Sequence, residues 1–206
     1  MQQAILFDLD DTLTDTRKRH HAVMADFLCA NGKQPPDFND YQEKRLAARQ
    51  SNKEIINTLY PGLSGKFSEF WMNKIEEREY LALDAELADT RLLSGLKETG
   101  ISMIILSLRA NQPNAIEQFA GFSFSKLFDQ TYFLPHGVMN PKAAVISSLK
   151  ERYSVTAMVG DANQDFEAAA QNDIPFIGVQ SGWYPLKSPI LFNNINSYLN
   201  QYLYGI

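Results

Sequence analysis

An apolar segment that ends in a cluster of carboxylates constrains this chain more than any other feature of its sequence. Residues 4–7 (Ala-Ile-Leu-Phe) have the character of a short buried strand, and Asp8, Asp10 and Asp11 follow within four positions. Negative charge at the end of a buried strand is costly unless a cation offsets it. Side chains two positions apart project to the same side of an extended chain, so Asp8 and Asp10 should lie together while Leu9 points away.

Two neighbouring carboxylates at a strand end suit a magnesium-assisted phosphoryl transfer. One carboxylate attacks phosphorus, the other handles the proton, and the metal offsets the charge. A plain charged turn after a strand is the alternative interpretation of this segment.

A second apolar segment, residues 157–159, leads through Gly160 into another acidic loop. Asp161 and Asp165 are four positions apart, so they share a face if a helix begins there. Acidic residues at a helix start also cap free N–H groups and complement the helix dipole. That ordinary role explains Asp165 better than Asp161, which follows the strand directly.

Between the two acidic loops the sequence places a hydroxyl and an ammonium group. Ser107 ends the apolar segment 101–106, and Lys142 stands at an expected helix start. A phosphate beside two acidic loops would accept hydrogen bonds from both groups. Lys126 and Lys150 are rival lysines, but neither stands between a loop and an amphipathic helix in the same way.

Taken in order, Asp8-Leu9-Asp10-Asp11-Thr12, Ser107, Lys142 and residues 160–165 resemble the four motifs of the haloacid dehalogenase-like (HAD) phosphatase superfamily. The resemblance spans nearly the whole chain and is closest to helical-cap members of the phosphoglycolate phosphatase and β-phosphoglucomutase type. It implies that Asp8 is the nucleophile that becomes an aspartyl-phosphate, and that Asp10 is the general acid and base. The Mg²⁺ ligands that it implies are Asp8, Asp161 and the backbone carbonyl of Asp10. The phosphate-binding residues that it implies are Ser107, Leu108 and Lys142, and the supporting residues are Thr12 and Asp165.

The sequence departs from the family pattern at three places. Asp11 stands where glycine is common, and Leu108-Arg109 follows Ser107 where asparagine is frequent. Pro141 precedes the motif lysine, whereas a proline often follows it. The second departure changes the expected contacts near the phosphate or the leaving group.

Segments with strand character alternate with helical patterns along most of the chain. The strand-like segments are 4–8, 102–107, 130–133, 157–160 and 175–179, and the helical ones between them are 113–119, 141–153 and 165–172. This alternation predicts an α/β fold with a Rossmann-like, doubly wound parallel sheet. Ligands of such sheets bind beyond the carboxyl ends of the strands, where Asp8, Ser107 and Asp161 are placed.

Residues 16–83 interrupt the alternation, because they show helical patterns and turn signals without a convincing strand. Helices are expected at 17–30, 40–50, 52–59 and 65–81. An all-helical insert after the first strand resembles the cap domain of the HAD family. We therefore expect a core domain of residues 1–15 and 84–206 and a cap domain of residues 16–83. Such a cap excludes water and contacts the part of the substrate that is not phosphate.

Six residues of the expected cap are candidates for substrate contact: Thr16, His20, Arg49, Ser51, Asn52 and Lys53. In similar proteins, residues at the position of His20 flank the active-site entrance, although a histidine on a helix facing a core is more often structural. Polar residues like those of segment 49–53 face the active site in similar proteins. Ser51 followed by Glu54 is also a capping box, which satisfies helix N–H groups without a ligand. Both interpretations of this segment stay open.

Charge and cysteine content narrow the choice of partners and compartment. The 206 residues carry a net charge of −5 without a basic block, which argues against a dedicated nucleic-acid binder. The single cysteine, Cys29, allows no internal disulfide, and its helical pattern predicts a buried thiol. Neither a signal peptide nor a stretch of transmembrane length is visible, so we expect a cytoplasmic protein without a membrane partner. The apolar stripe from Ile195 to Leu203 predicts a closing helix and is compatible with a monomer or a homodimer.

These features together predict a magnesium-dependent phosphohydrolase that cleaves a small phosphorylated metabolite. A phosphomutase of the β-phosphoglucomutase type would use the same core residues, and a non-catalytic binding protein on this fold is a third possibility. A haloalkanoate dehalogenase needs no acid at position 10, so Asp10 argues against it. The substrate stays open among phosphoglycolate, sugar phosphates, nucleoside monophosphates and pyrophosphate.

Overall fold

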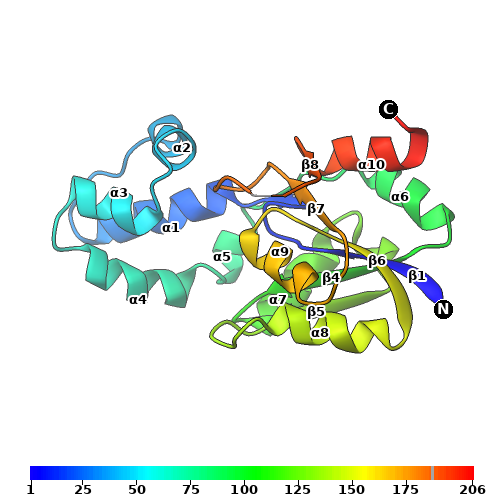
Figure 1. Cartoon of the computed structure of the whole chain (residues 1–206). Coiled ribbons are helices and arrows are strands. Elements are labelled where there is room, and N and C mark those ends of the chain that lie inside the picture. The colour runs from blue at the N-terminus through cyan, green and yellow to red at the C-terminus, as the bar shows by residue number, and fades with distance from the viewer. Residues whose placement is uncertain (187) are drawn as a thin grey trace. The chain divides into compact units, whose positions relative to one another are not determined.

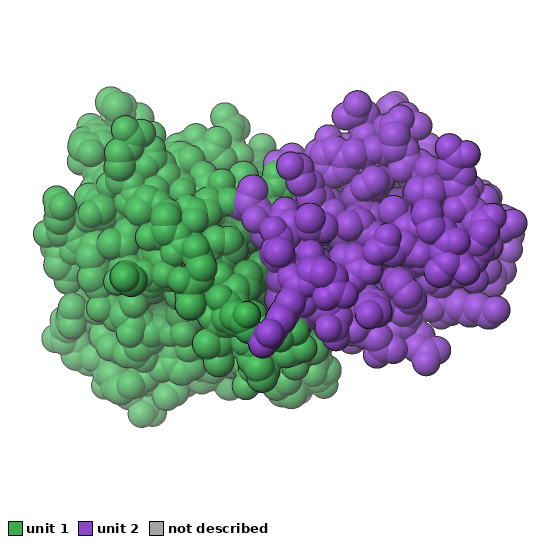
Figure 2. All heavy atoms as spheres, turned by 180° about the vertical axis from the view of Figure 1, so that it is seen from behind, with its two compact units in different colours: residues 1–15, 86–206 green, residues 16–85 purple. Residues whose placement is uncertain are grey.

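The computed structural model of this chain describes residues 1–186 and 188–206. It divides into two compact units, coloured separately in Figure 2: residues 1–15 with 86–206, and residues 16–85. The sequence pattern places the same insert at residues 16–83. The chain passes between the units at two short strands, β2 (Thr14–Asp15) and β3 (Ala85–Glu86).

The larger unit contains a six-stranded parallel sheet in the order β5-β4-β1-β6-β7-β8 (Figure 1). The strands are β1 (Gln2–Phe7), β4 (Ser102–Leu108), β5 (Gln130–Leu134), β6 (Tyr153–Gly160), β7 (Phe176–Val179) and β8 (Leu191–Phe192). From β1 the chain continues outward on one side through β4 and β5. It then returns to the other side of β1 with β6. In α/β sheets, ligands bind at such a reversal, beyond the carboxyl ends of the central strands.

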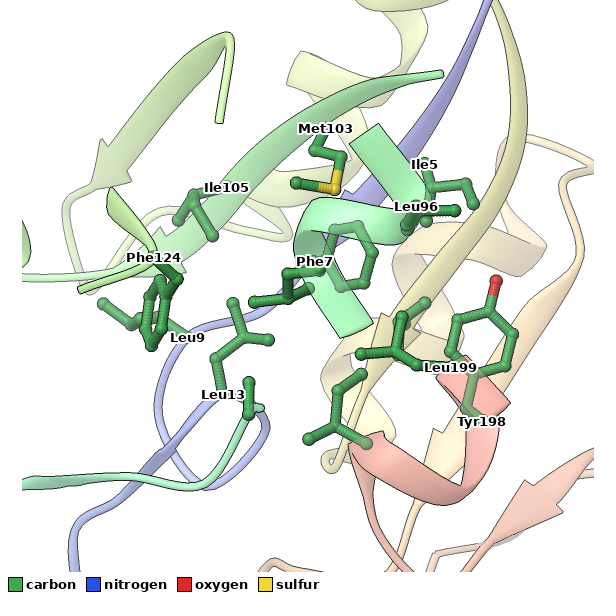
Figure 3. Close-up of a cluster of buried hydrophobic side chains, with 14 of the residues drawn as sticks. Ile5, Phe7, Leu9, Leu13, Leu96, Met103, Ile105, Phe124, Tyr198 and Leu199 are labelled. Carbon is green, nitrogen blue, oxygen red and sulfur yellow. The ribbon is translucent and has the colours of Figure 1, made fainter. Parts of the chain in front are cut away.

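Helices cover both faces of the sheet because the strand side chains alternate. On β1, Ile5 and Phe7 belong to one buried cluster, and Ala4 and Leu6 belong to another. The first cluster takes in residues of α6 (Thr90–Glu98), α7 (Gln112–Gly121) and α10 (Ile195–Tyr204), and the second those of α8 (Pro141–Lys150) and α9 (Asn163–Ala170). Figure 3 shows part of the first cluster, with Leu96 of α6 beside Ile5 of β1 and with Leu199 and Tyr198 of α10 in the same cluster. The predicted doubly wound α/β architecture is therefore confirmed.

The sequence pattern misses several elements of this unit. Strand β6 begins at Tyr153, four residues before the expected start at Ala157. Helix α6, the two-residue strand β8 and the 3₁₀ turn η1 (Ser125–Leu127) lie outside the expected segments. Helix α6 is nine residues long and buries only Leu93 and Leu96 fully. Too few apolar residues therefore recur at helical spacing for the sequence to indicate this helix.

The smaller unit is built from helices α1 (Arg17–Ala30), α2 (Phe38–Leu46), α3 (Asn52–Leu59), α4 (Ser64–Lys74) and α5 (Arg78–Leu81). The bounds of α1 and α3 agree with the expected ones. The expected helix 65–81 is divided into α4 and α5, because Glu77 adopts an extended backbone with ψ of 149°. Over the described part of the chain, no helix combines the length and apolar character needed to cross a bilayer.

The expectation that Cys29 is a buried thiol is wrong, since Cys29 is exposed near the end of α1. The buried apolar residues of α1 are Val23, Met24, Phe27 and Leu28. The residue after Leu28 is rotated by a further ~100° around a helix of 3.6 residues per turn, so it leaves the buried face.

Candidate functional site

Three carboxylates converge at the carboxyl ends of the central strands. Asp8 follows β1, Asp161 follows β6, and Asp165 lies in the first turn of α9. One oxygen of each carboxylate lies within 4.8 Å of the others. The strand register brings them together, because Phe7 pairs with Val159 and the N–H of Asp8 donates to the carbonyl of Val159 at 2.9 Å.

Lys142 is the cation of this cluster. Its side chain is buried, and Nζ lies 2.5 Å from Oδ1 of Asp8 and 2.5 Å from Oδ1 of Asp165. Lys142 is held at the start of α8 by a capped helix end. The Asn140 side chain accepts the N–H of Ala143, and Pro141 occupies the first helical position. The proline before the lysine, a departure from the family pattern, thus has a local structural reason.

The rival lysines lie in other environments. Lys150 donates to the carbonyl of Asn172, and Lys126 belongs to η1. Lys142 therefore matches the expected position beside the acidic loops.

Negative charge exceeds positive charge in this cluster. Burial raises the pKa of Asp8 to about 7 against the attraction of Lys142, and the carboxylates of Asp165 and Asp10 add to the increase. Burial and the neighbouring carboxylates also raise the pKa of Asp161. Burial alone would lower the pKa of Lys142, but Asp165 and Asp8 raise it and keep the ammonium charged. Converging carboxylate oxygens with uncompensated repulsion fit a hard divalent cation.

The loop after β1 brings the remaining first-motif residues into place. Leu9 is buried in the core, while the side chain of Asp10 is 31% exposed. Asp11 has a φ of 55°, in the left-handed region that glycine adopts without strain and that aspartate tolerates. This backbone explains why glycine suits position 11. Thr12 Oγ1 donates to Asp161 Oδ1 at 3.2 Å and so links the two acidic loops.

Asp165 combines two contacts. Its Oδ2 accepts the N–H of Ala162 at 3.2 Å, so it caps α9 as its position at a helix start predicts. Its Oδ1 accepts from Lys142. The capping interpretation and the supporting role are therefore compatible.

Ser107 and Leu108 end β4, the strand beside β1. Ser107 is buried, and it lies two positions beyond Ile105, which pairs with Phe7. The Ser107 side chain is thus carried to the same edge of the sheet as Asp8. Leu108 is half-buried at the end of the strand.

A second buried cation, Arg109, accompanies Asp10. Its Nη2 donates to Oδ1 of Asp10 and, at 3.2 Å, to Oε1 of Gln118 on α7. Only 1% of Arg109 is exposed. The sequence pattern marks this position only as a departure from the family motif. Arg109 lies two positions after Ser107, and side chains two positions apart on an extended strand project to the same side. This spacing is the sequence feature that could have indicated Arg109 as a site residue.

Two glycines leave room for the acidic side chains. A Cβ on Gly160 would lie 2.4 Å from Oδ2 of Asp165, and a Cβ on Gly182 would lie 2.1 Å from Oδ2 of Asp161. Gly182 lies in the loop after β7, which the sequence pattern does not connect with the site. This loop also forms part of a cavity of about 410 Å³ whose lining includes Asp161, Glu167 and Tyr184.

The six expected cap contacts belong to the smaller unit. Thr16 is buried, and its carbonyl accepts the N–H of His20. The His20 ring packs edge-on against Trp71, with 5.0 Å between the centroids. Packing of this kind fits the structural interpretation of His20, and the contact of either residue with a substrate stays a prediction.

The segment 49–53 has a defined structural task. Ser51 Oγ accepts the N–H of Glu54, and the Glu54 carboxylate accepts the N–H of Ser51 at 2.7 Å, so the predicted capping box is confirmed. Asn52 is buried and accepts the Tyr41 hydroxyl at 2.8 Å. Arg49 and Lys53 are exposed.

Comparison with known proteins gives one family. A family model described as haloacid dehalogenase-like hydrolase matches residues 2–173. Among curated proteins, none matched the chain.

Solved structures with the same fold carry different descriptions. A HAD-superfamily hydrolase of Geobacter sulfurreducens is 17% identical, with 98% of this chain and 96% of that chain covered and a TM-score of 0.71. A predicted phosphoglycolate phosphatase of Haemophilus somnus is 17% identical, with 96% of both chains covered and a TM-score of 0.65. Protein Tyrosine Kinase A of Mycobacterium tuberculosis is 19% identical, with 98% of both chains covered and a TM-score of 0.68. At these identities the likeness concerns the fold, so the activity has to be argued from the site.

We predict that Mg²⁺ stabilises the protein more at pH 8 than at pH 5.5. The pKa of Asp8 is raised from 3.8 to about 7, so the folded chain holds this proton more tightly than the unfolded chain. The stability of the metal-free protein should therefore fall as the pH rises through this window, and a bound cation should restore it. Melting temperatures with EDTA and with Mg²⁺ at the two pH values measure this effect.

Asp161→Asn is the control for this experiment. Removal of one carboxylate should raise the melting temperature without metal and weaken the Mg²⁺ response. A Mg²⁺ response that is equal at both pH values, or undiminished in Asp161→Asn, would contradict a cation site at this cluster.

We also predict that Gly182→Ala disturbs the Asp161 side of the site. The added methyl group overlaps the Asp161 carboxylate, and such overpacking costs roughly 1–3 kcal/mol, a fall of several degrees in melting temperature. The stabilisation by Mg²⁺ should shrink with it. Gly121→Ala is the matched control, because a Cβ there meets no atom within 4 Å. Equal melting temperatures and equal Mg²⁺ responses for the two variants would disprove the close approach.

Proposed function

We propose that this chain, which belongs to the haloacid dehalogenase-like hydrolase family, is a magnesium-dependent phosphatase of a small phosphorylated metabolite. The observation that carries the proposal is the buried cluster in which Lys142 contacts both Asp8 and Asp165, beside Asp161. This cluster lies at the carboxyl edge of the sheet, where α/β folds bind ligands. The family match supports hydrolysis. The excess of negative charge supports a divalent cation, which an anionic substrate would need before it approaches the carboxylates.

The metal would be held by oxygen ligands from both acidic loops. We assign Asp8, Asp161 and the backbone carbonyl of Asp10 as its ligands, with Asp165 and Thr12 in support. When bound, Mg²⁺ offsets the charge of the carboxylates and of the phosphoryl group. Hard oxygen donors without sulfur or imidazole favour Mg²⁺ over softer metals.

Asp8 is the nucleophile in this proposal. Its carboxylate attacks phosphorus as the bond from phosphorus to the leaving oxygen breaks, and Asp10 gives its proton to that oxygen. Asp10 then takes a proton from water while the water oxygen attacks the phosphorus of the aspartyl-phosphate. Phosphate is released, and the Asp8 carboxylate is restored.

Lys142 and Ser107 complete the phosphate-binding part. The Lys142 ammonium fixes one oxygen of Asp8 and keeps its charge at the place where the phosphoryl oxygens would lie. Ser107 supplies a hydroxyl from the neighbouring strand. Leu108 contributes its backbone, which adjoins this hydroxyl at the strand end.

We propose that the smaller unit acts as a cap and recognises the leaving group of the substrate. Ser51 and Asn52 make contacts that hold α3 in place. Among the candidates of this segment, we assign substrate contact to the exposed cations Arg49 and Lys53 because of their charge. Their charge suits a metabolite with a second anionic group. Thr16 and His20, at the start of the unit, are the other candidates. A metabolite, rather than a nucleic acid, also fits the net charge of −5.

A phosphomutase would use the same core residues and pass the phosphoryl group to a second hydroxyl instead of water. Release of inorganic phosphate, rather than formation of an isomeric phosphate ester, distinguishes the hydrolase from the mutase.

We predict that the protein releases phosphate from at least one compound of a metabolite panel with Mg²⁺, and that Asp8→Asn lowers this turnover about 10³-fold or more. The amide is a poor nucleophile and a weaker metal ligand than the carboxylate. The panel includes phosphoglycolate, sugar phosphates, nucleoside monophosphates and pyrophosphate, and released phosphate is the measured quantity.

Asp173→Asn is the matched control for this substitution, because Asp173 is exposed and its left-handed φ of 53° is tolerated by asparagine. It should keep wild-type turnover. Near wild-type turnover by Asp8→Asn, or no phosphate release from any compound, would refute the proposed function.

A further inference from the structure

We infer that Arg109 is a positioning residue that fixes the carboxylate of Asp10 for its role as the acid and base. This inference rests on the proposed function, because it concerns the acid and base of that reaction. It stands on the contact between the Arg109 guanidinium and Oδ1 of Asp10, and on the burial of Arg109.

Arg109 is anchored at both ends. Its backbone N–H donates to the carbonyl of Leu134 at 2.7 Å, which continues the pairing of β4 with β5. At the other end, Nη2 donates to Gln118 on α7 at 3.2 Å. A guanidinium held by a strand and a helix presents its donors in a fixed direction.

The chemistry of the pair separates the two roles, because only one of the two side chains can transfer a proton. A guanidinium has donors only and keeps its proton at any working pH, so it cannot take part in the transfer. The proton is therefore exchanged by Asp10, while the contact of Nη2 with Oδ1 fixes the direction of the Asp10 carboxylate. The Asp10 side chain is 31% exposed while that of Arg109 is 1% exposed, so solvent or a substrate reaches the pair from the side of Asp10.

The two reacting carboxylates thus have separate cations. Lys142 holds Asp8, which is buried, and Arg109 holds Asp10 at the edge of the site. Lys142 and Arg109 contact different reacting carboxylates, so each carboxylate can be oriented for its own task. A correctly placed general acid matters most for esters whose leaving oxygen cannot depart without a proton.

The test compares two phosphate esters, of which only one has a leaving oxygen that must be protonated. The 4-nitrophenolate ion leaves without a proton, whereas the oxygen of benzyl phosphate must be protonated as it leaves. The kcat/KM value for each ester reports the steps up to departure of the alcohol, in which Asp10 acts as the acid. We predict that Arg109→Gln lowers kcat/KM for benzyl phosphate at least tenfold more than for 4-nitrophenyl phosphate.

The ratio of the two kcat/KM values does not depend on the concentration of folded enzyme, so partial unfolding of a variant leaves it unchanged. Arg109→Lys should give a ratio between those of Arg109→Gln and the wild type, because one ammonium group keeps the charge but not the fork of donors. Arg152→Gln is the matched control in the same unit, since Arg152 is exposed and donates to the Tyr132 hydroxyl. Its ratio should equal that of the wild type.

An equal loss for both esters in Arg109→Gln would overturn the positioning role and leave the phosphatase proposal intact. A larger loss for 4-nitrophenyl phosphate would overturn it as well. If the wild type cleaves neither ester and no compound of the metabolite panel, the proposed function fails and this inference fails with it.

Discussion

The structure of the site depends on one interaction, the contact of buried Lys142 with both Asp8 and Asp165. Without the ammonium group, the carboxylates at the ends of β1 and β6 would face one another in a dry environment at a high electrostatic cost. One ammonium does not balance them: burial, together with the carboxylates of Asp165 and Asp10, raises the pKa of Asp8 to about 7 despite the attraction of Lys142. The cluster of Asp8, Asp161 and Asp165 could hold a divalent cation, and a bound cation would relieve this repulsion and thereby stabilise the fold.

The fold provides this arrangement through ordinary features of a parallel sheet. Alternation along β1 buries Leu6 on one face and Phe7 on the other, and the strand then ends at Asp8 where the order of strands reverses. The capped start of α8 carries Lys142 to the same edge. Glycines at 160 and 182 let the carboxylates approach the backbone more closely than any Cβ would permit. Together these features bring residues that lie far apart in the sequence to the carboxyl edge of the sheet.

The sequence predicts local features well and long-range partners less well. The strand before Asp8, the lysine at the start of α8 and the capping box at Ser51 are local patterns, and the structure agrees with them. The partner of Arg109 lies 99 positions away in the chain, so no local pattern indicates the contact with Asp10. The close approach of Gly182 to Asp161 is hidden for the same reason. The wrong expectation for Cys29 has another origin, since an apolar residue next to the buried face of a helix can still point away from it.

The most direct test of the account asks whether phosphate is bound to Asp8 during turnover. Enzyme mixed with 4-nitrophenyl phosphate and Mg²⁺ is quenched in acid and reduced with borohydride, which converts an aspartyl-phosphate into homoserine. Peptide mass spectrometry then locates the product. If Asp8 is the nucleophile, homoserine appears at position 8, and only with substrate present. Conversion at another residue, or phosphate release without conversion at any residue, would contradict Asp8 as the nucleophile.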